Sequence, residues 1–173
     1  MKKNLFRIIT AALILTVVFG VLASCGDQSD GQDSGDTEQG GKELYAVSYN
    51  GETVALGGDA KKVTAKIGEP ASKQSTGNCG GLGETVRYDY SSFIMVVVEY
   101  ESGAKIDQIE IRNDLVETAG GITIGSSESA VRSAYGEPNE VKGTTLIYKS
   151  GKNRMNVGIE DGYVSFLTLK VEG

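Results

Sequence analysis

The sequence predicts an α+β fold built as a tandem repeat. In each copy a short helix precedes an antiparallel three-stranded meander, and both helices pack on one face of the sheet. A Gly-Glu-Pro motif occurs at residues 68–70 and again at 136–138, and the fifteen residues ending at each motif align without a gap. Beyond each motif, apolar and polar residues alternate as in half-buried strands. We therefore expect one domain over residues 44–173, with a first repeat at 44–117 and a second at 118–173.

The first 24 residues are typical of an export signal. Lys2, Lys3 and Arg7 precede an apolar run over residues 8–21, which is too short and wrongly flanked for a membrane-spanning helix. The run leads into Leu-Ala-Ser-Cys25, which resembles the lipobox of bacterial lipoproteins. That resemblance implies that Cys25 is lipidated, becomes the new N-terminus and holds the protein on the outer side of the bacterial cell membrane. The alternative is an ordinary secretory signal in which Cys25 has no role.

Cleavage before Cys25 leaves a strongly acidic protein. Residues 1–24 hold three basic side chains and no acidic one, so their removal takes the formal net charge from −6 to −9. A surface of this sign repels phosphate backbones and anionic headgroups. We therefore expect no nucleic-acid partner, and membrane attachment through the lipid alone. A diacyl anchor is sufficient, because each buried methylene contributes about 0.8 kcal/mol.

Residues 25–43 form a polar tether behind the lipidated cysteine. Residues 26–43 contain no apolar side chain and are rich in Gly, Ser and Asp. Such a composition cannot offset the entropy of ordering the chain, and a flexible segment of this length reaches about 23 Å. The tether is therefore expected to space the domain from the membrane.

Each repeat begins with recognisable turn and capping signals. The first opens with a hairpin over residues 45–56, because Asn50-Gly51 favours a type I′ turn between two alternating runs. Asp59 is a suitable N-cap for a helix over 60–66, and Gly68 and Pro70 end that helix. The same signals recur in the second copy. We interpret the glycines and prolines at the aligned positions as structural rather than ligand-binding: Gly57, Gly68, Pro70, Gly125, Gly136 and Pro138.

Three strands are expected after each motif. They cover residues 85–90, 93–101 and 105–112 in the first copy, and 145–149, 154–160 and 163–171 in the second. The offset between the copies falls after Pro70, so the segment 71–84 carries an insertion of about eight residues. This segment contains Cys79 and Leu82 in a glycine-rich run. Cys79 is either a small buried hydrophobic residue or an exposed thiol open to oxidation and intermolecular pairing.

The order of elements resembles a known family. An apolar strand, a glycine, a short helix with a central valine, Gly-x-Pro and a meander follow one another, most clearly over residues 118–138. This pattern resembles the β-lactamase-inhibitor-protein-like (BLIP-like) fold, which is a tandem repeat, and the SmpA/OmlA-type small lipoproteins, which have one such unit. The resemblance implies a helix-backed antiparallel sheet whose open face binds other proteins. The disulfides of the inhibitor are absent, so no contact residue is carried over.

The residue types argue against catalysis. The chain has no His, and the mature protein keeps one thiol besides Cys25, which excludes Ser-His-Asp, Cys-His and His-based metal sites. The carboxylate pairs Glu99/Glu101 and Glu160/Asp161 fit a solvated sheet edge better than a weak cation site. We therefore predict no enzyme activity, no cofactor and no metal.

The strand at 93–101 provides the sharpest functional hypothesis. Its even-numbered residues, from Ile94 to Tyr100, are expected to face the helices, as do their counterparts Met155, Val157 and Ile159 in the second copy. This leaves Phe93, Met95 and Val97 on the opposite face, where the second copy has the outward residues Arg154, Asn156, Gly158 and Glu160. Because one face of an antiparallel sheet normally meets water, a cluster of apolar residues there indicates a binding surface. The alternative is that the insertion or the N-terminal hairpin covers these side chains. Other aromatic residues with uncertain facing would extend the patch: Tyr88, Tyr90, Tyr163 and Phe166.

Together these features predict a non-enzymatic surface lipoprotein. It would bind another protein or a cell-envelope component through the open sheet face and the 71–84 insertion. Two alternatives remain at this point: a lipoprotein that binds a small ligand or a cation in a cleft between the repeats, and a purely structural envelope component.

Overall fold

The computed structural model describes residues 45–78 and 83–173. The expected export signal, Cys25 and the tether lie outside the described residues, as do Cys79 and Leu82. None of the described helices is long and apolar enough to cross a membrane. The elements are β1 (Ala46–Tyr49), β2 (Glu52–Ala55), α2 (Ala60–Ile67), β3 (Ser72–Asn78), β4 (Glu84–Asp89), β5 (Phe93–Tyr100), β6 (Gly103–Ile111), β7 (Glu117–Thr118), α3 (Glu128–Tyr135), β8 (Glu140–Lys142), β9 (Thr145–Ser150), β10 (Asn153–Glu160) and β11 (Tyr163–Val171).

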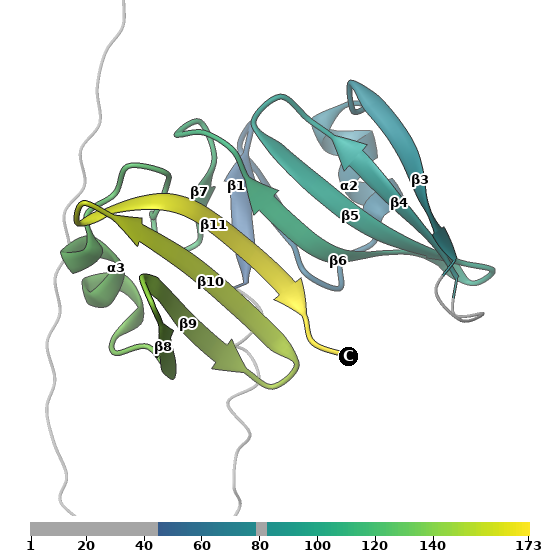
Figure 1. The fold of residues 1–173 in the computed structure, drawn as a ribbon. Coiled ribbons are helices and arrows are strands. Elements are labelled where there is room, and N and C mark those ends of the chain that lie inside the picture. Colours follow the sequence, from purple (N-terminus) through teal and green to yellow (C-terminus); the bar gives the residue numbers. More distant parts are fainter. Residues whose placement is uncertain (1–44, 79–82) are drawn as a thin grey trace, which may run out of the picture. The chain divides into compact units, whose positions relative to one another are not determined.

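A large antiparallel sheet dominates this α+β structure. Its eight strands have the order β3-β4-β5-β6-β11-β10-β9-β8, so the strands follow chain order from each edge to the centre (Figure 1). We call β3 to β6 the first meander and β8 to β11 the second. The two meanders meet at the antiparallel pair β6–β11, where Ile109 lies opposite Leu169 and Ile111 lies opposite Leu167. Apolar side chains therefore continue across the junction.

The expectation of three strands per meander is wrong, because β3 and β8 add a fourth strand to each. Segment 71–84 consequently contains strand β3. The other six strands agree with the predicted bounds to within two residues. Strand β3 has the sequence Ser-Lys-Gln-Ser-Thr-Gly-Asn, which lacks the apolar alternation that identifies a strand. It forms an edge of the sheet, where polar residues are usual because they discourage further pairing.

A separate three-stranded sheet has the order β2-β1-β7. The β1–β2 hairpin turns at Asn50 and Gly51, whose φ angles are 52° and 77°. Both angles are positive, as a type I′ turn requires, so the predicted hairpin is confirmed. Strand β7 pairs with β1 through Val47–Thr118 and Ser48–Glu117. The N-terminal hairpin is thereby joined to the segment that connects the two meanders.

Both helices begin and end at the predicted capping residues. The Asp59 carboxylate accepts hydrogen bonds from the backbone N–H groups of Lys61 and Lys62 at the start of α2, and Ser127 accepts one from Ala130 at the start of α3. These bonds satisfy N–H groups that have no partner within the helix. At the other end, Gly68 and Gly136 have φ angles of 94° and 75°. A side chain is strained at such positive angles, which explains the glycine in each Gly-Glu-Pro motif.

A tyrosine on the sheet binds each of these terminal glycines. The Tyr90 hydroxyl donates to the Gly68 carbonyl at 3.1 Å, and the Tyr148 hydroxyl donates to the Gly136 carbonyl at 3.2 Å. The amides that precede the helices are anchored similarly. Gly57 N–H donates to the Ile106 carbonyl at 2.7 Å, and Gly125 N–H donates to the Val164 carbonyl at 2.8 Å. Each helix is thus tied at both ends to its own meander.

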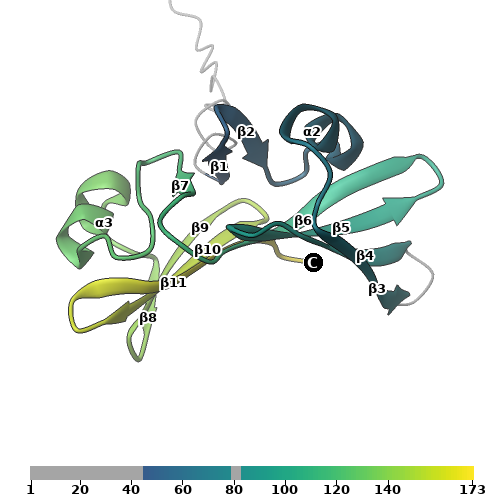
Figure 2. The same ribbon diagram turned by 90° about the horizontal axis from the view of Figure 1, so that it is seen from above.

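The hydrophobic core lies between the large sheet and the layer formed by the two helices and the small sheet. Figure 2 shows both helices and the small sheet on the same side of the large sheet. A single cluster of buried residues joins the two sheets and both helices, with Val54 from β2, Ala60 from α2 and Val131 from α3 each 0% exposed. We call the side of the large sheet that faces this core its inner face and the opposite side its outer face.

Candidate functional site

The expected facing of strand β5 is wrong. Phe93, Met95 and Val97 are each 0% exposed and belong to the core cluster, so they lie on the inner face. The Tyr49 ring of the N-terminal hairpin contacts the Phe93 ring edge-on at 5.1 Å between centroids, and Tyr90 stacks on Phe93 at 4.7 Å. The alternative in which the hairpin covers these residues is therefore correct for Phe93. These side chains offer no surface to a partner.

A one-residue error in aligning the two copies explains the inverted facing. The expectation matched Ile94 with Met155, whereas the two strands begin at Phe93 and Asn153 and so match Met95 with Met155. Both methionines are 0% exposed and lie in the core. Because successive strand residues point to opposite faces, a slip of one residue transfers the whole set to the other face. The even-numbered residues of β5 therefore lie on the outer face.

Tyr88 and Tyr90 are core residues rather than parts of an exposed patch, since they are 5% and 4% exposed. The Tyr88 hydroxyl donates to Glu99 Oε1 at 2.8 Å, and the Lys73 ammonium lies 4.7 Å from the Tyr88 ring centroid. Burial, followed by the hydrogen bond to Glu99, raises the pKa of Tyr88 to about 12. Both tyrosines thus stabilise the first meander, and neither is available to a partner.

Figure 2 shows no described helix or strand over the outer face of the large sheet. Its members follow from the alternation of side chains along each strand and from the register between strands. Ile94 and Ile147 are almost fully buried there without joining the core cluster. The cross-strand neighbours of Ile94 are Asp89 and Glu110. Arg87 and Arg112 both form ion pairs with Asp89. The stems of such long side chains can shield an aliphatic neighbour from water while their charged ends remain solvated.

Two lines of residues that run across the strands on this face each carry charges of one sign. The first line, which we call the basic row, has no carboxylate and consists in register of Lys149, Arg154, Lys170, Gln108, Val96, Arg87 and Gln74. The second line, the acidic row, has no cation and consists of Glu140, Ile147, Asn156, Thr168, Glu110, Ile94, Asp89 and Ser72. The two rows are two residues apart along each strand, or about 7 Å.

Ion pairs within the described residues neutralise the basic row unevenly. In the first meander, Arg87 Nη2 lies 3.7 Å from Asp89 Oδ2 of the acidic row. Arg154 Nη1 lies 2.9 Å from Glu172 Oε1, and its Nε donates to Asn156 Oδ1 at 2.7 Å. Lys149 Nζ lies 3.5 Å from Glu140 Oε2. The same Glu140 carboxylate also pairs with Lys142 at 3.1 Å. The second meander therefore presents more cations than paired carboxylates along this row.

Exposed aromatic residues occur at the ends of the outer face. Tyr163 is 58% and Phe166 is 44% exposed at the start of β11, and Tyr100 is 46% exposed at the end of β5. The Phe166 ring covers Gly158 so closely that a Cβ atom on this glycine would lie 2.0 Å from Phe166 Cε1. A glycine opposite an aromatic ring gives the ring a flat surface to rest on. Packing against Gly158 therefore explains in part why an aromatic residue is exposed at Phe166.

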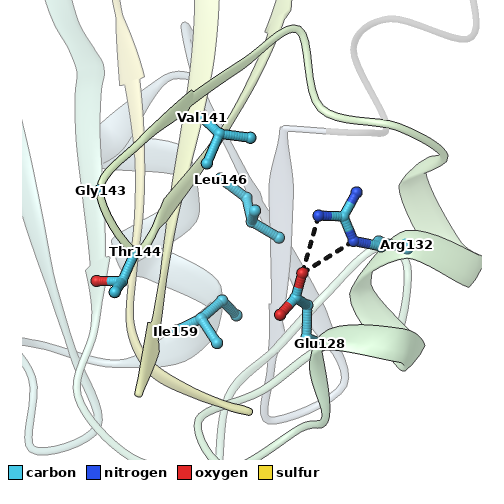
Figure 3. A pocket seen from close by; sticks show the side chains of 7 residues that line it. All are labelled: Glu128, Arg132, Val141, Gly143, Thr144, Leu146 and Ile159. Atoms are coloured by element: carbon cyan, nitrogen blue, oxygen red, sulfur yellow. Dashed lines mark hydrogen bonds and ion pairs between the residues drawn. The ribbon is translucent and has the colours of Figure 1, made fainter. Parts of the chain in front are cut away.

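A small pocket lies at one end of the second meander. Its volume is about 220 Å³, and Figure 3 shows Glu128 and Arg132 of α3 facing Leu146 and Ile159 across it. The aligned positions of α2 are the buried Ala60 and Thr64, which bring that helix directly onto its sheet. Charged residues at these positions of α3 leave the space open. The remaining lining residues are Val141, Gly143 and Thr144.

No grouping of His, Cys, Asp and Glu within residues 45–78 and 83–173 could hold a metal ion. Of the two carboxylate pairs considered from sequence, Glu99 and Glu101 do not act together. Glu99 accepts the Tyr88 hydrogen bond on the inner side, whereas Glu101 lies in the β5–β6 turn.

Comparisons with known proteins give little further guidance. No protein-family model matches the sequence, and no curated protein matches it. Among solved structures, the chain is similar to a crystal structure described as a DUF4309 family protein (YjgB) from Bacillus subtilis subsp. subtilis str. 168. The two share 18% sequence identity with a TM-score of 0.37, over 66% of this chain and 78% of that chain. This likeness is too distant to place the chain in that family.

Proposed function

We propose that the protein is a non-enzymatic binding module that attaches to another protein or to a cell-envelope component through the outer face of its large sheet. The observation that carries the proposal is the outer face itself: no described element covers it, and two of its cross-strand rows each carry charges of one sign. Within the basic row, Lys149, Arg154 and Lys170 lie directly opposite one another, and like charges in such positions are destabilising. A partner with complementary charges would offset that cost.

The proposal includes export and attachment to the membrane. We infer that residues 1–24 are removed, that Cys25 carries the lipid and that residues 26–43 act as the tether. The support is the sequence of these segments, which combines a basic start, an apolar run and a lipobox-like end. Lipidation can be tested by mass spectrometry of the membrane fraction, where Cys25→Ser should abolish both the diacyl mass and the sedimentation with membranes. A lipid-free protein in wild-type membranes would contradict this inference.

We also propose that the two halves are copies of one BLIP-like unit. Three parallels support this: the mirrored strand order about β6–β11, the N-cap and glycine end of each helix, and the tyrosine bond to each terminal glycine. The enlarged β3–β4 hairpin is then the main difference between the copies. This layout places both helices on one side and leaves a continuous surface on the other, which suits a broad interface.

The binding role of the outer face can be tested with a matched pair of tryptophan substitutions in the full mature chain. Thr168→Trp places a bulky group at the middle of the outer face, whereas Ser133→Trp places one on the exposed side of α3. Neither changes the charge. We expect Thr168→Trp to abolish retention of the purified protein on isolated cell envelopes and Ser133→Trp to leave it unchanged, with equal urea midpoints as the folding control. Equal retention of both variants would refute the proposal.

The pocket beside α3 supports a second candidate, the binding of a small ligand with an apolar part. At about 220 Å³ the pocket is smaller than most ligand sites, but it combines apolar walls with the Glu128–Arg132 ion pair. Thermal unfolding in the presence of a metabolite panel would test it, because a ligand that binds only the folded state raises the midpoint. Val141→Trp, which fills the mouth of the pocket, should abolish any such shift. A shift that survives Val141→Trp would rule out this pocket.

A further inference from the structure

We propose that the outer face of the second meander binds a linear phosphate-bearing polymer along Lys149, Arg154 and Lys170. The inference rests on the proposed function and specifies the chemistry of the partner. These three cations occupy adjacent strands at directly opposed positions, because Arg154 pairs with Lys149 on one side and with Lys170 on the other. Neighbouring strands are about 4.8 Å apart, so the three residues form a line about 10 Å long.

Neutral hydrogen-bonding groups lie directly beside this line. The corresponding positions of the acidic row on the same strands are Ile147, Asn156 and Thr168, none of which is charged. The Asn156 carbonyl oxygen accepts from Arg154 Nε, which leaves the Asn156 amide N–H groups for a ligand. The Thr168 hydroxyl is a further donor. Three cations and two polar donors on three adjacent strands thus make a locally positive patch suited to phosphate oxygens, on a protein whose net charge is negative.

The cations retain capacity for a ligand. Lys170 has no ion pair within the described residues, and Lys149 shares the Glu140 carboxylate with Lys142. The main competitor is Glu172 in the chain segment after β11. The hydrogen bond from Arg154, together with the fields of Lys149 and Lys170, lowers the pKa of Glu172. A bound anion would replace Glu172 in the same positive field.

The linear arrangement of the three cations favours a chain of phosphates over a flat anionic membrane and over a single phosphate ion. Glu140 and Glu110 bound the neutral triplet at its two ends on the same face. A flat anionic membrane would therefore meet these carboxylates together with the cations. A single phosphate could reach at most two of the three cations, whereas a chain would reach all of them. The affinity for a chain rises with each phosphate that contacts a cation, because once one phosphate is bound the next contacts form within the same complex.

The chemistry of the row favours a polymer without bases. Proteins that bind single-stranded nucleic acids combine basic grooves with aromatic side chains on which bases stack. The basic row has no aromatic residue along its length. Arg154 also suits phosphate particularly well, because a guanidinium binds two oxygens at once. The predicted partner is accordingly a polymer whose backbone phosphates are the recognised groups.

Calorimetric titration of the full mature chain with inorganic polyphosphate at low ionic strength tests the proposal. We expect binding that weakens with added salt, and at least tenfold weaker binding of orthophosphate. The double variant Lys149→Gln/Lys170→Gln should lose at least tenfold in affinity. The control Lys61→Gln/Lys62→Gln, which removes the same charge from α2, should be unchanged. Glu172→Gln should bind a few-fold more tightly, because it frees Arg154.

Several outcomes would overturn the inference. The first is an equal loss of affinity for polyphosphate in the two double variants. The second is binding of orthophosphate as tight as that of polyphosphate. The third is equally tight binding of polyglutamate, single-stranded DNA or phosphatidylglycerol vesicles. The envelope assay separates this failure from that of the proposed function. If Thr168→Trp loses envelope retention while Lys149→Gln/Lys170→Gln keeps it, the outer face is an interface but its partner is not a phosphate polymer. If polyphosphate binds as expected while Thr168→Trp keeps retention, the proposed function fails instead.

Discussion

The facing of strand β5 can be tested with two neighbouring valines that undergo the same substitution. Val97 is 0% exposed and belongs to the core cluster, whereas Val96 lies half-buried on the outer face. Both residues lie within the strand, so Val→Ala removes the same volume and a similar strand preference at each. Any difference in stability between the two variants therefore reports the face on which each residue lies.

The expected magnitudes differ by more than the error of measurement. Val97→Ala removes two buried methyl groups, worth about 1.6 kcal/mol in transfer free energy, and leaves a cavity in the core, so we expect a total cost of about 2–3 kcal/mol. Val96→Ala should cost about 1 kcal/mol or less, because its side chain is already partly hydrated. For a domain of this size the larger cost lowers the thermal midpoint by several degrees.

Urea unfolding of the mature chain, followed by circular dichroism, is the appropriate assay. The slope of free energy against urea must stay constant across the variants so that midpoints can be compared. If Val96→Ala costs as much as Val97→Ala, or more, then the assignment of inner and outer faces in this strand is wrong. In that event the basic and acidic rows would also have to be reassigned.

Three further predictions concern packing, the helix ends and pH. Gly158→Ala should destabilise the fold by about 1–3 kcal/mol, because its Cβ would overlap the Phe166 ring. In a double-mutant cycle measured by urea unfolding, Phe166→Ala should recover part of that loss, and an absence of coupling would show that the ring moves freely. Tyr148→Phe and Tyr90→Phe should each cost about 0.5–1.5 kcal/mol in the same assay by removing the bond to the terminal glycine, and unchanged midpoints would mean that these bonds add nothing. Burial raises the pKa of Tyr45 and of Tyr88 to about 12. Above about pH 10 the folded state therefore keeps phenol protons that the unfolded state loses, and the thermal midpoint should fall between pH 10 and 12. Tyr88→Phe should flatten that fall, and an equally steep fall in the variant would contradict the assignment.

Local signals in the sequence were sufficient to predict the hairpin, both capped helices and six of the strands. Each depends on residues close together in the chain, such as Asn50-Gly51 for the turn and Asp59 with Gly68 for the ends of α2. Strand β3 was not predicted because its polar sequence resembles a loop, and only pairing with β4 identifies it as a strand. Edge strands of this kind give little local signal.

The two charged rows of the outer face could not be predicted from the sequence, because they depend on pairing between distant strands. The outward positions Arg154, Asn156 and Gly158 were expected from alternation, and the structure places them on the outer face. Their alignment with Lys149 and Lys170 requires the registers of two hairpins, and extension to Gln108 requires the β6–β11 pair. In strand β5, both sets of alternating residues are apolar, so alternation alone did not distinguish inside from outside. The facing of β5 follows instead from the offset of 60 residues between Phe93 and Asn153, the first residues of β5 and β10.

The central β6–β11 pair has a consequence for how the chain folds. Every other pairing in the large sheet joins strands that are consecutive in sequence, so each meander can form through local contacts soon after it is synthesised. The β6–β11 pair brings together residues 108–111 and 167–170, and its formation must wait for the whole second meander. Closing so long a loop is entropically costly and slow compared with forming a hairpin. During biosynthesis, one edge of β6 therefore stays unpaired until β11 has been made, and an unpaired edge is a template for pairing with another chain.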